Sequence, residues 1–152
     1  MATGLGVATL FGLGVIGGAG ASSTTVGGIG LYSLGGALSN VADPNAYSVV
    51  VAGSAEYNEL AGLPGTSLAY FSGTDVNTDW STGVPYSQAA ANGWLLTDGS
   101  GNLLVNQGYP NNYVGDVGSS AYQQAWISNV LSYLGAHPGI KGVFIDDVLY
   151  DL

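Results

Sequence analysis

Two adjacent carboxylates, Asp146 and Asp147, end a short apolar stretch close to the end of the sequence. Burying a charge at the end of a hydrophobic strand costs free energy unless the charge has a use. In barrels of alternating strands and helices, catalytic groups stand at the carboxyl ends of the strands. Asp116 ends another apolar stretch. Paired carboxylates cleave glycosidic bonds, one as acid and the other as base or nucleophile, so these three residues are the candidate catalytic groups.

Each of these aspartates also has a purely structural alternative. Asp116 could cap a helix that begins near Ser119, and Asp147 could make a hydrogen bond within a turn. Successive side chains of a strand point to opposite faces of a sheet. Asp146 and Asp147 are therefore not expected to face the same cleft, and Asp146 is preferred to Asp147 as the catalytic residue.

Tyr70 and Trp94 are the candidate substrate-binding residues. An aromatic ring offers a sugar a flat apolar face and a polar edge, although core packing is an equal alternative for both side chains. His137 is the single histidine and the chain has no cysteine, so no metal site is expected. The Gly-X-Gly pairs near the start follow no predicted strand, and no dinucleotide or other cofactor is expected.

The order of the predicted elements is typical of a parallel α/β fold. Strands are predicted over four short apolar stretches, at residues 47–52, 67–72, 113–117 and 142–148. A short helix or turn is predicted over 54–63, helices over 86–92 and 121–134, and a hairpin around 98–101. The helix over 121–134 has the length of a crossover, so the strands on either side of it should be parallel neighbours. Asp116 and Asp146 should then lie at the same mouth.

Composition excludes several classes of partner. The chain has 152 residues, of which 47% are hydrophobic and only 7% are charged. Its formal net charge is −9, with one Lys or Arg in total, so nucleic acid is not an expected partner. Anionic membranes would also repel the chain. A surface with so few charges either relies on Ser, Thr, Asn, Gln and Tyr for solubility or is covered by partners, as in large assemblies.

Residues 1–40 form an apolar leader that is rich in glycine. Gly4, Gly12, Gly20, Gly28 and Gly36 recur every eight residues. Glycine at a regular spacing lets backbones approach closely, which favours packing among identical subunits. A signal peptide and a membrane span are the alternatives. No positive charge precedes the apolar run, as a signal peptide would require, and the glycines disfavour a membrane helix.

Residues 47–150 resemble the glycosyl hydrolase-like family 15 group, whose members have a TIM-barrel fold. The resemblance is carried by short motifs, among them Leu68-Ala-Tyr-Phe-Ser72, Tyr122-Gln-Gln-Ala-Trp126 and Gly142-Val-Phe-Ile-Asp-Asp-Val148. It implies Asp116 and Asp146 as active-site carboxylates. Such domains also occur in minor tail proteins of phages that infect actinobacteria, and the leader is similar to the opening of those tail-tip proteins. That setting implies a trimer anchored in the tail.

The sequence thus predicts two parts: an assembly segment over 1–40 and the N-terminal half of a TIM-type (β/α) barrel over 41–152. A complete barrel takes about 250 residues and eight strands, so the chain is expected to continue or to be completed by other chains. The leading hypothesis is a virion tail-tip protein whose barrel cleaves or binds a glycan of the host envelope. A secreted glycoside hydrolase with an export segment, and a structural protein that binds glycan without cleaving it, are the alternatives.

Overall fold

The computed structural model describes Asn45 and residues 47–53, 56–79, 83–106 and 108–147, together with the backbone of residues 30–33. Apart from 30–33, the predicted leader lies outside these residues. The chain divides into two compact units. The first holds the chain up to Ala69 and residues 137–144, and the second holds Tyr70–Ala136 and the chain from Ile145 onward. The division falls inside two strands, β3 (Thr66–Ser72) and β6 (Gly142–Asp146), and between Ala136 and His137.

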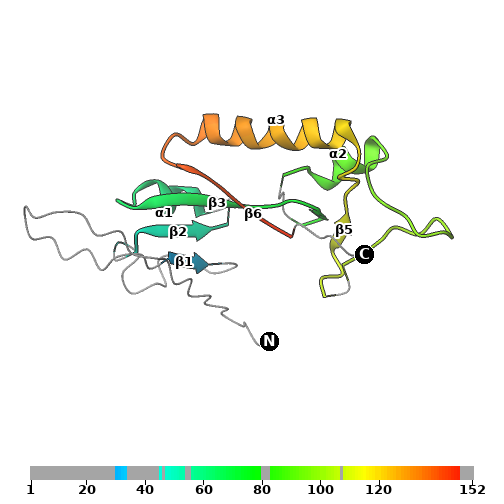
Figure 1. The fold of residues 1–152 in the computed structure, drawn as a ribbon, viewed down its shortest axis with the longest axis horizontal. Coiled ribbons are helices and arrows are strands. Elements are labelled where there is room, and N and C mark those ends of the chain that lie inside the picture. Colours follow the sequence, from blue (N-terminus) through cyan, green and yellow to red (C-terminus); the bar gives the residue numbers. More distant parts are fainter. Residues whose placement is uncertain are drawn as a thin grey trace, which may run out of the picture. The chain divides into compact units, whose positions relative to one another are not determined.

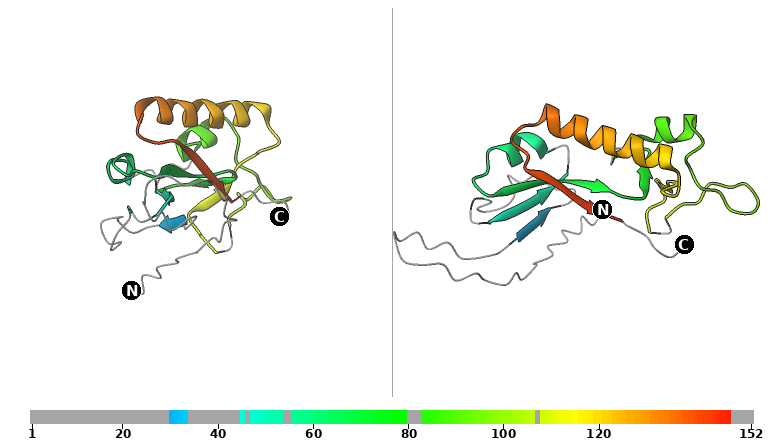
Figure 2. Two further views of the ribbon diagram at one scale, coloured as in Figure 1. Left: turned by 60° about the vertical axis from the view of Figure 1, so that its left-hand side comes forward. Right: turned by 45° about the horizontal axis from the view of Figure 1, so that its top comes forward.

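The fold is mixed α/β, with a sheet in the order β1-β2-β3-β6. β1 (Gly30–Ser33) pairs in parallel with β2 (Val49–Ala52), and β2 pairs in parallel with β3. These three strands lie side by side (Figures 1 and 2). A parallel sheet with helices was predicted and is confirmed. The described residues form no closed barrel.

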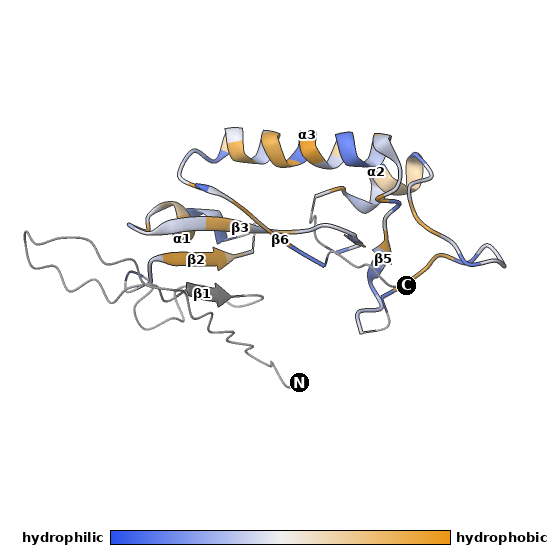
Figure 3. Cartoon of the chain, viewed as in Figure 1, coloured by the Kyte–Doolittle hydropathy of each residue, from blue (hydrophilic) through white to orange (hydrophobic). Residues whose placement is uncertain are grey.

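The first unit is built on the apolar strand β2 (Figure 3). Val50, Val51 and Ala52 are buried, as is Leu60 of the short helix α1 (Tyr57–Ala61). The buried Ser67 hydroxyl donates to the Leu60 carbonyl oxygen at 2.6 Å, which ties α1 to β3. β1 lies within the predicted leader, so the sheet begins earlier in the chain than the predicted boundary at residue 41.

The second unit holds two helices and a small antiparallel sheet. Helix α2 (Tyr86–Ala91) and the long helix α3 (Ser120–Ala136) lie close to their predicted ranges. Apolar and polar residues alternate along α3 (Figure 3), and its least exposed side chains include Tyr122, Trp126 and Val130. The core of the unit consists of Val76, Val84, Ala89 and Tyr122, with Trp94 and Trp126 among the rings packed against it. None of the described helices has the length and apolar character that crossing a membrane requires.

One strand prediction is wrong. The segment predicted as a third parallel strand, 113–117, contributes β5 (Asn112–Val114), which pairs antiparallel with β4 (Asp75–Asn77) in a separate two-stranded sheet. β4 was not among the predicted strands, and Asp and Asn, which it contains, are poor strand formers. Asn77 and Asn112 are a directly opposed pair, and the Asn77 side-chain amide donates a hydrogen bond to the Asn112 amide oxygen across this ladder.

The predicted hairpin forms next to this ladder. Thr97 bridges Leu103 in antiparallel fashion, and the Leu104 N–H donates to the Leu96 carbonyl oxygen at 2.9 Å. The Asp98 carboxylate accepts hydrogen bonds from the Ser100 and Asn102 N–H groups, both at 2.8 Å, and so closes the turn. The Asn102 side-chain amide also donates to this carboxylate, at 3.0 Å. That bond, followed by the two N–H bonds, holds the pKa of Asp98 below its usual value.

Candidate functional site

The carboxyl ends of β3 and β6 meet within the second unit. The N–H of Gly73, just past β3, donates to the Asp146 carbonyl oxygen at 2.7 Å. Asp147 follows with φ of +51°, a left-handed conformation that is uncommon outside glycine. The chain leaves strand geometry here, so the alternation that was expected to separate Asp146 from Asp147 no longer applies. Both residues are half-buried.

Tyr70 holds the Asp147 carboxylate in place. Its hydroxyl donates to Asp147 Oδ2 at 2.7 Å, and the Thr74 hydroxyl donates to the Asp147 carbonyl oxygen. The Tyr70 side chain is only 5% exposed. Its ring therefore presents no open face to a sugar, and its hydroxyl serves to orient a carboxylate. Tyr70 was predicted to lie in the site, and the structure places it beside Asp147 in this different role.

A third carboxylate, that of Asp75, lies near Asp146 and Asp147. It was not among the predicted site residues. Asp75 is 2% exposed, and its Oδ2 accepts hydrogen bonds from the Asn112 amide at 2.7 Å and the Asn106 amide at 3.2 Å. Burial raises the pKa of Asp75 above its usual value, and the carboxylates of Asp147 and Asp146 raise it further, while the two amide donors oppose the rise.

Asp75 could have been found by the rule that singled out Asp146. It stands three residues after the end of the apolar strand β3, as an acidic residue at the carboxyl end of a parallel strand. Its N–H donates to the Ser72 hydroxyl at 2.8 Å, which fixes the turn between β3 and β4. The polar composition of the segment hid this signal, because it favoured a loop.

Tyr122 is a second buried polar group in this region. The side chain is 2% exposed, and among the described residues its hydroxyl has no hydrogen-bond partner. Burial, followed by the nearby Asp75 carboxylate, raises the pKa of Tyr122 to about 12. Trp94 packs edge-on against the Tyr122 ring, with centroids 6.2 Å apart. Trp94 is thus half-buried against the core. Core packing was the alternative to a substrate-binding role for this side chain.

The Asp116 N–H donates to the Trp94 carbonyl oxygen at 2.8 Å, whereas its carboxylate makes a local contact. Its Oδ1 accepts a hydrogen bond from the Gly118 N–H at 3.2 Å, in the turn that leads into α3. Ser119 caps this helix, because its hydroxyl accepts from the Tyr122 N–H at 3.4 Å. β5 does not belong to the sheet of β6. The expected adjacency of Asp116 and Asp146 therefore loses its basis, and a catalytic role for Asp116 stays a prediction.

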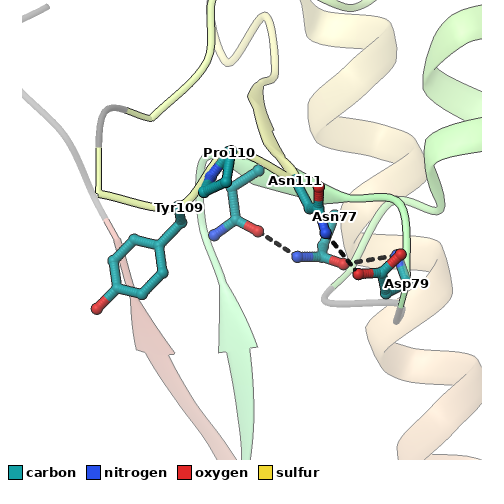
Figure 4. Close-up of a pocket in the computed structure, with 6 residues that line it drawn as sticks. Asn77, Asp79, Tyr109, Pro110 and Asn111 are labelled. Carbon is teal, nitrogen blue, oxygen red and sulfur yellow. Dashed lines mark hydrogen bonds between the residues drawn. The ribbon is translucent and has the colours of Figure 1, made fainter. Parts of the chain in front are cut away.

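A shallow pocket of about 220 Å³ opens at the end of the β4–β5 ladder. It is lined by Asn77, Asp79, Tyr109, Pro110, Asn111 and Asn112 (Figure 4). The Asn111 amide donates to Asp79 Oδ2 at 2.7 Å, and the Asp79 N–H donates to Asn77 Oδ1 at 2.6 Å. The Asn112 amide connects the pocket to the carboxylates, since its nitrogen donates to Asp75 and its oxygen accepts from Asn77.

Among the described residues, no group of three or more acidic, His or Cys side chains could hold a metal ion. His137 packs against Tyr57 in the first unit, with ring centroids 4.1 Å apart. Asp146 and Asp147 reach solvent while Asp75 is enclosed, so the three carboxylates occupy different environments.

Compared with known proteins, the chain matches no protein-family model and no curated protein sequence.

Proposed function

We propose that this protein acts on a glycan, and that Asp146 and Asp147 are the carboxylates that face the glycosidic bond. The observation that carries this proposal is the meeting of both residues with Asp75 and Tyr70 at the carboxyl ends of two neighbouring strands. Hydrolysis of a glycosidic bond needs an acid and a base or nucleophile, which a carboxylate pair supplies.

The roles within the pair follow from the contacts. Tyr70 and Thr74 hold Asp147 at a side-chain and a backbone oxygen, so its carboxylate is oriented before substrate binds. We assign Asp147 as base or nucleophile and Asp146 as acid. Asp75 is too enclosed to touch substrate and acts as a positioning residue, because its buried carboxyl group sets the electrostatic field around the pair.

The wider setting is proposed on the same basis. A parallel sheet with a helical crossover and acidic strand ends is compatible with part of a TIM-type barrel. A low content of charged residues and a single basic residue suit a subunit enclosed in a large assembly. We propose a tail-tip protein of a phage virion, with the glycan of a bacterial envelope as substrate and other tail subunits as partners.

The test is hydrolysis of a panel of envelope glycans, including arabinogalactan, by the full chain and its variants. Asp146→Asn and Asp147→Asn should each lower turnover by about 100-fold or more, the usual contribution of acid–base groups. Tyr70→Phe removes one hydroxyl and should cost about tenfold, with a changed pH profile, because Asp147 loses its orienting donor. Release of reducing sugar measures each rate.

Two further variants separate this site from the alternatives. Glu59→Gln removes an exposed carboxylate from helix α1 of the first unit and should leave turnover unchanged. Asp116→Asn tests the residue implied by family resemblance, and a loss confined to this variant would contradict our assignment. Glycan binding without hydrolysis by any form of the protein would favour a non-catalytic binding role.

A further inference from the structure

We infer that the pocket beside the carboxylates is a binding subsite for one neutral sugar unit, with Tyr109 as its stacking platform. This inference rests on the proposed glycan function and adds to it a second site on the glycan path. Tyr109 is 64% exposed, the highest exposure among the large hydrophobic side chains that stand open to solvent in the described part of the chain. Tyrosine combines an apolar ring face with a polar edge, which is the surface that a sugar ring requires.

The polar groups of the pocket are fixed before any ligand arrives. Figure 4 shows the Tyr109 ring on one side of the pocket and Asp79 on the other, with asparagine amides between them. Asp79 accepts hydrogen bonds from the Asn111 amide at 2.7 Å and the Thr78 hydroxyl at 3.2 Å. A carboxylate has about four acceptor positions and an amide nitrogen two donors, so both groups keep capacity for sugar hydroxyls.

Charge selects the class of ligand. The pocket lining holds one carboxylate and no Lys or Arg, and the whole sequence has a single residue of these two types, Lys141. A phosphate or other anion would meet repulsion without a compensating partner. A neutral polyol can donate to the carboxylate and both donate to and accept from the amides. The mixture of acceptors, donors and an exposed ring therefore fits an uncharged sugar.

The pocket is coupled to the carboxylates through one residue. Asn112 lines the pocket, and its amide nitrogen holds Asp75 Oδ2 at 2.7 Å. Asn112 is 7% exposed and sits in β5 opposite Asn77. A sugar bound on Tyr109 would thus rest against the residue that fixes Asp75. We assign the pocket to a sugar unit next to the one that is cleaved.

Binding is measured by saturation-transfer NMR and by titration of the ¹⁵N-labelled full chain with methyl glycosides of glucose, galactose, mannose and arabinose. At least one glycoside should bind with a roughly millimolar Kd and shift the signals of Asp79 and Asn111. Tyr109→Ala should weaken this binding about tenfold, while Tyr109→Phe, which keeps the ring, should stay within about twofold of wild type. Leu131→Ala, a matched truncation of a side chain that is 61% exposed, should have no effect.

Three results would overturn the inference. They are no binding by any of the four glycosides, equal binding by wild type and Tyr109→Ala, and a response of the Asp79 and Asn111 signals to Ca²⁺ but not to sugars. The subsite and the catalytic proposal fail separately. Tyr109-dependent binding without hydrolysis leaves the subsite standing alone, and Asp147-dependent hydrolysis with Tyr109-independent binding removes only the subsite.

Discussion

At the scale of single residues, Asp75 is the least expected group in the molecule. Its side chain is almost fully enclosed, yet it lies near two further carboxylates. Two asparagine amides offset part of the cost of burying its charge. The raised pKa means that the folded protein holds the Asp75 proton more tightly than the unfolded chain does. At a pH below the ordinary pKa of aspartate, Asp75 is protonated in the folded and the unfolded chain, so folding does not bury a charge there.

The sign of the pH effect follows from this difference. As pH rises from the ordinary aspartate range through the raised value, ionisation of Asp75 lowers the free energy of unfolding. Asp75→Asn cannot ionise and retains an oxygen to accept from Asn106 and Asn112. We expect the free energy of unfolding of the variant to lack the decrease that ionisation of Asp75 causes in the wild type. The variant should therefore become more stable relative to the wild type as pH rises toward 7. Urea denaturation between pH 4 and 8 measures it, and parallel curves for the two proteins would contradict the prediction.

At the scale of elements, Trp126 contributes both a hydrogen bond and ring contacts to the packing of helix α3. The Trp126 indole N–H donates to the Ser72 carbonyl oxygen at 2.8 Å, and the Phe71 ring packs edge-on against Trp126 and Tyr133. Gly83 faces the same indole. A Cβ at Gly83 would lie 2.3 Å from Trp126 Nε1, and its φ is +132°. Space and backbone conformation both require glycine at this position.

Three glycine-to-alanine substitutions separate these two requirements. Gly83→Ala adds a clash and backbone strain and should destabilise the protein by about 2–4 kcal/mol. Gly93→Ala has strain alone, since its φ is +68° with nothing within 4 Å, and should cost about 1 kcal/mol. Gly99→Ala has neither feature and should stay within about 0.5 kcal/mol of wild type. Thermal and urea unfolding should give that order, and a loss for Gly83→Ala no larger than that for Gly93→Ala would show that Trp126 can move to relieve the clash.

At the scale of the whole molecule, the uncharged leader differs in composition from the rest of the chain. The chain passes between its two units three times, within β3, at the end of α3 and within β6. The first charged residue is Asp43, so the leader carries none of the net charge of −9. β1, at residues 30–33, already belongs to the sheet, which limits the separable part of the leader to residues before it.

We therefore expect residues 1–28 to carry the assembly function. The full chain should sediment as a trimer, and the chain lacking residues 1–28 should sediment as a monomer at the same ionic strength, because the deletion removes no charge. Circular dichroism confirms that the shortened chain is folded. A double Ile127→Ser, Leu131→Ser variant removes the exposed apolar pair of α3 and should remain trimeric. A trimer that survives the deletion, or dissolves in the α3 variant, would contradict this assignment.

Local signals in the sequence predicted much of the secondary structure. Apolar runs with β-branched residues mark β2, β3 and β6, and a helical pattern with Ser119 at its start marks α3. These elements follow from residues close together in the chain. β4 was not predicted, and β5 was predicted as a strand with the wrong partner, because the residues that pair in their ladder, such as Asn77 and Asn112, are 35 residues apart in sequence. The pairing partner of a strand is a tertiary property.

The candidate site divides in the same way. The sequence alone determined that Asp146 and Asp147 end a strand of a parallel α/β fold, because an acidic pair after an apolar run is a local pattern. Only the tertiary structure decided their neighbours. It placed Tyr70 and Asp75 beside Asp147, more than 70 residues away in the chain. It also placed the Asp116 carboxylate in the turn before α3 and packed Trp94 against the core. Carboxylate roles depend on burial and on nearby charges, and these exist only once distant segments pack together.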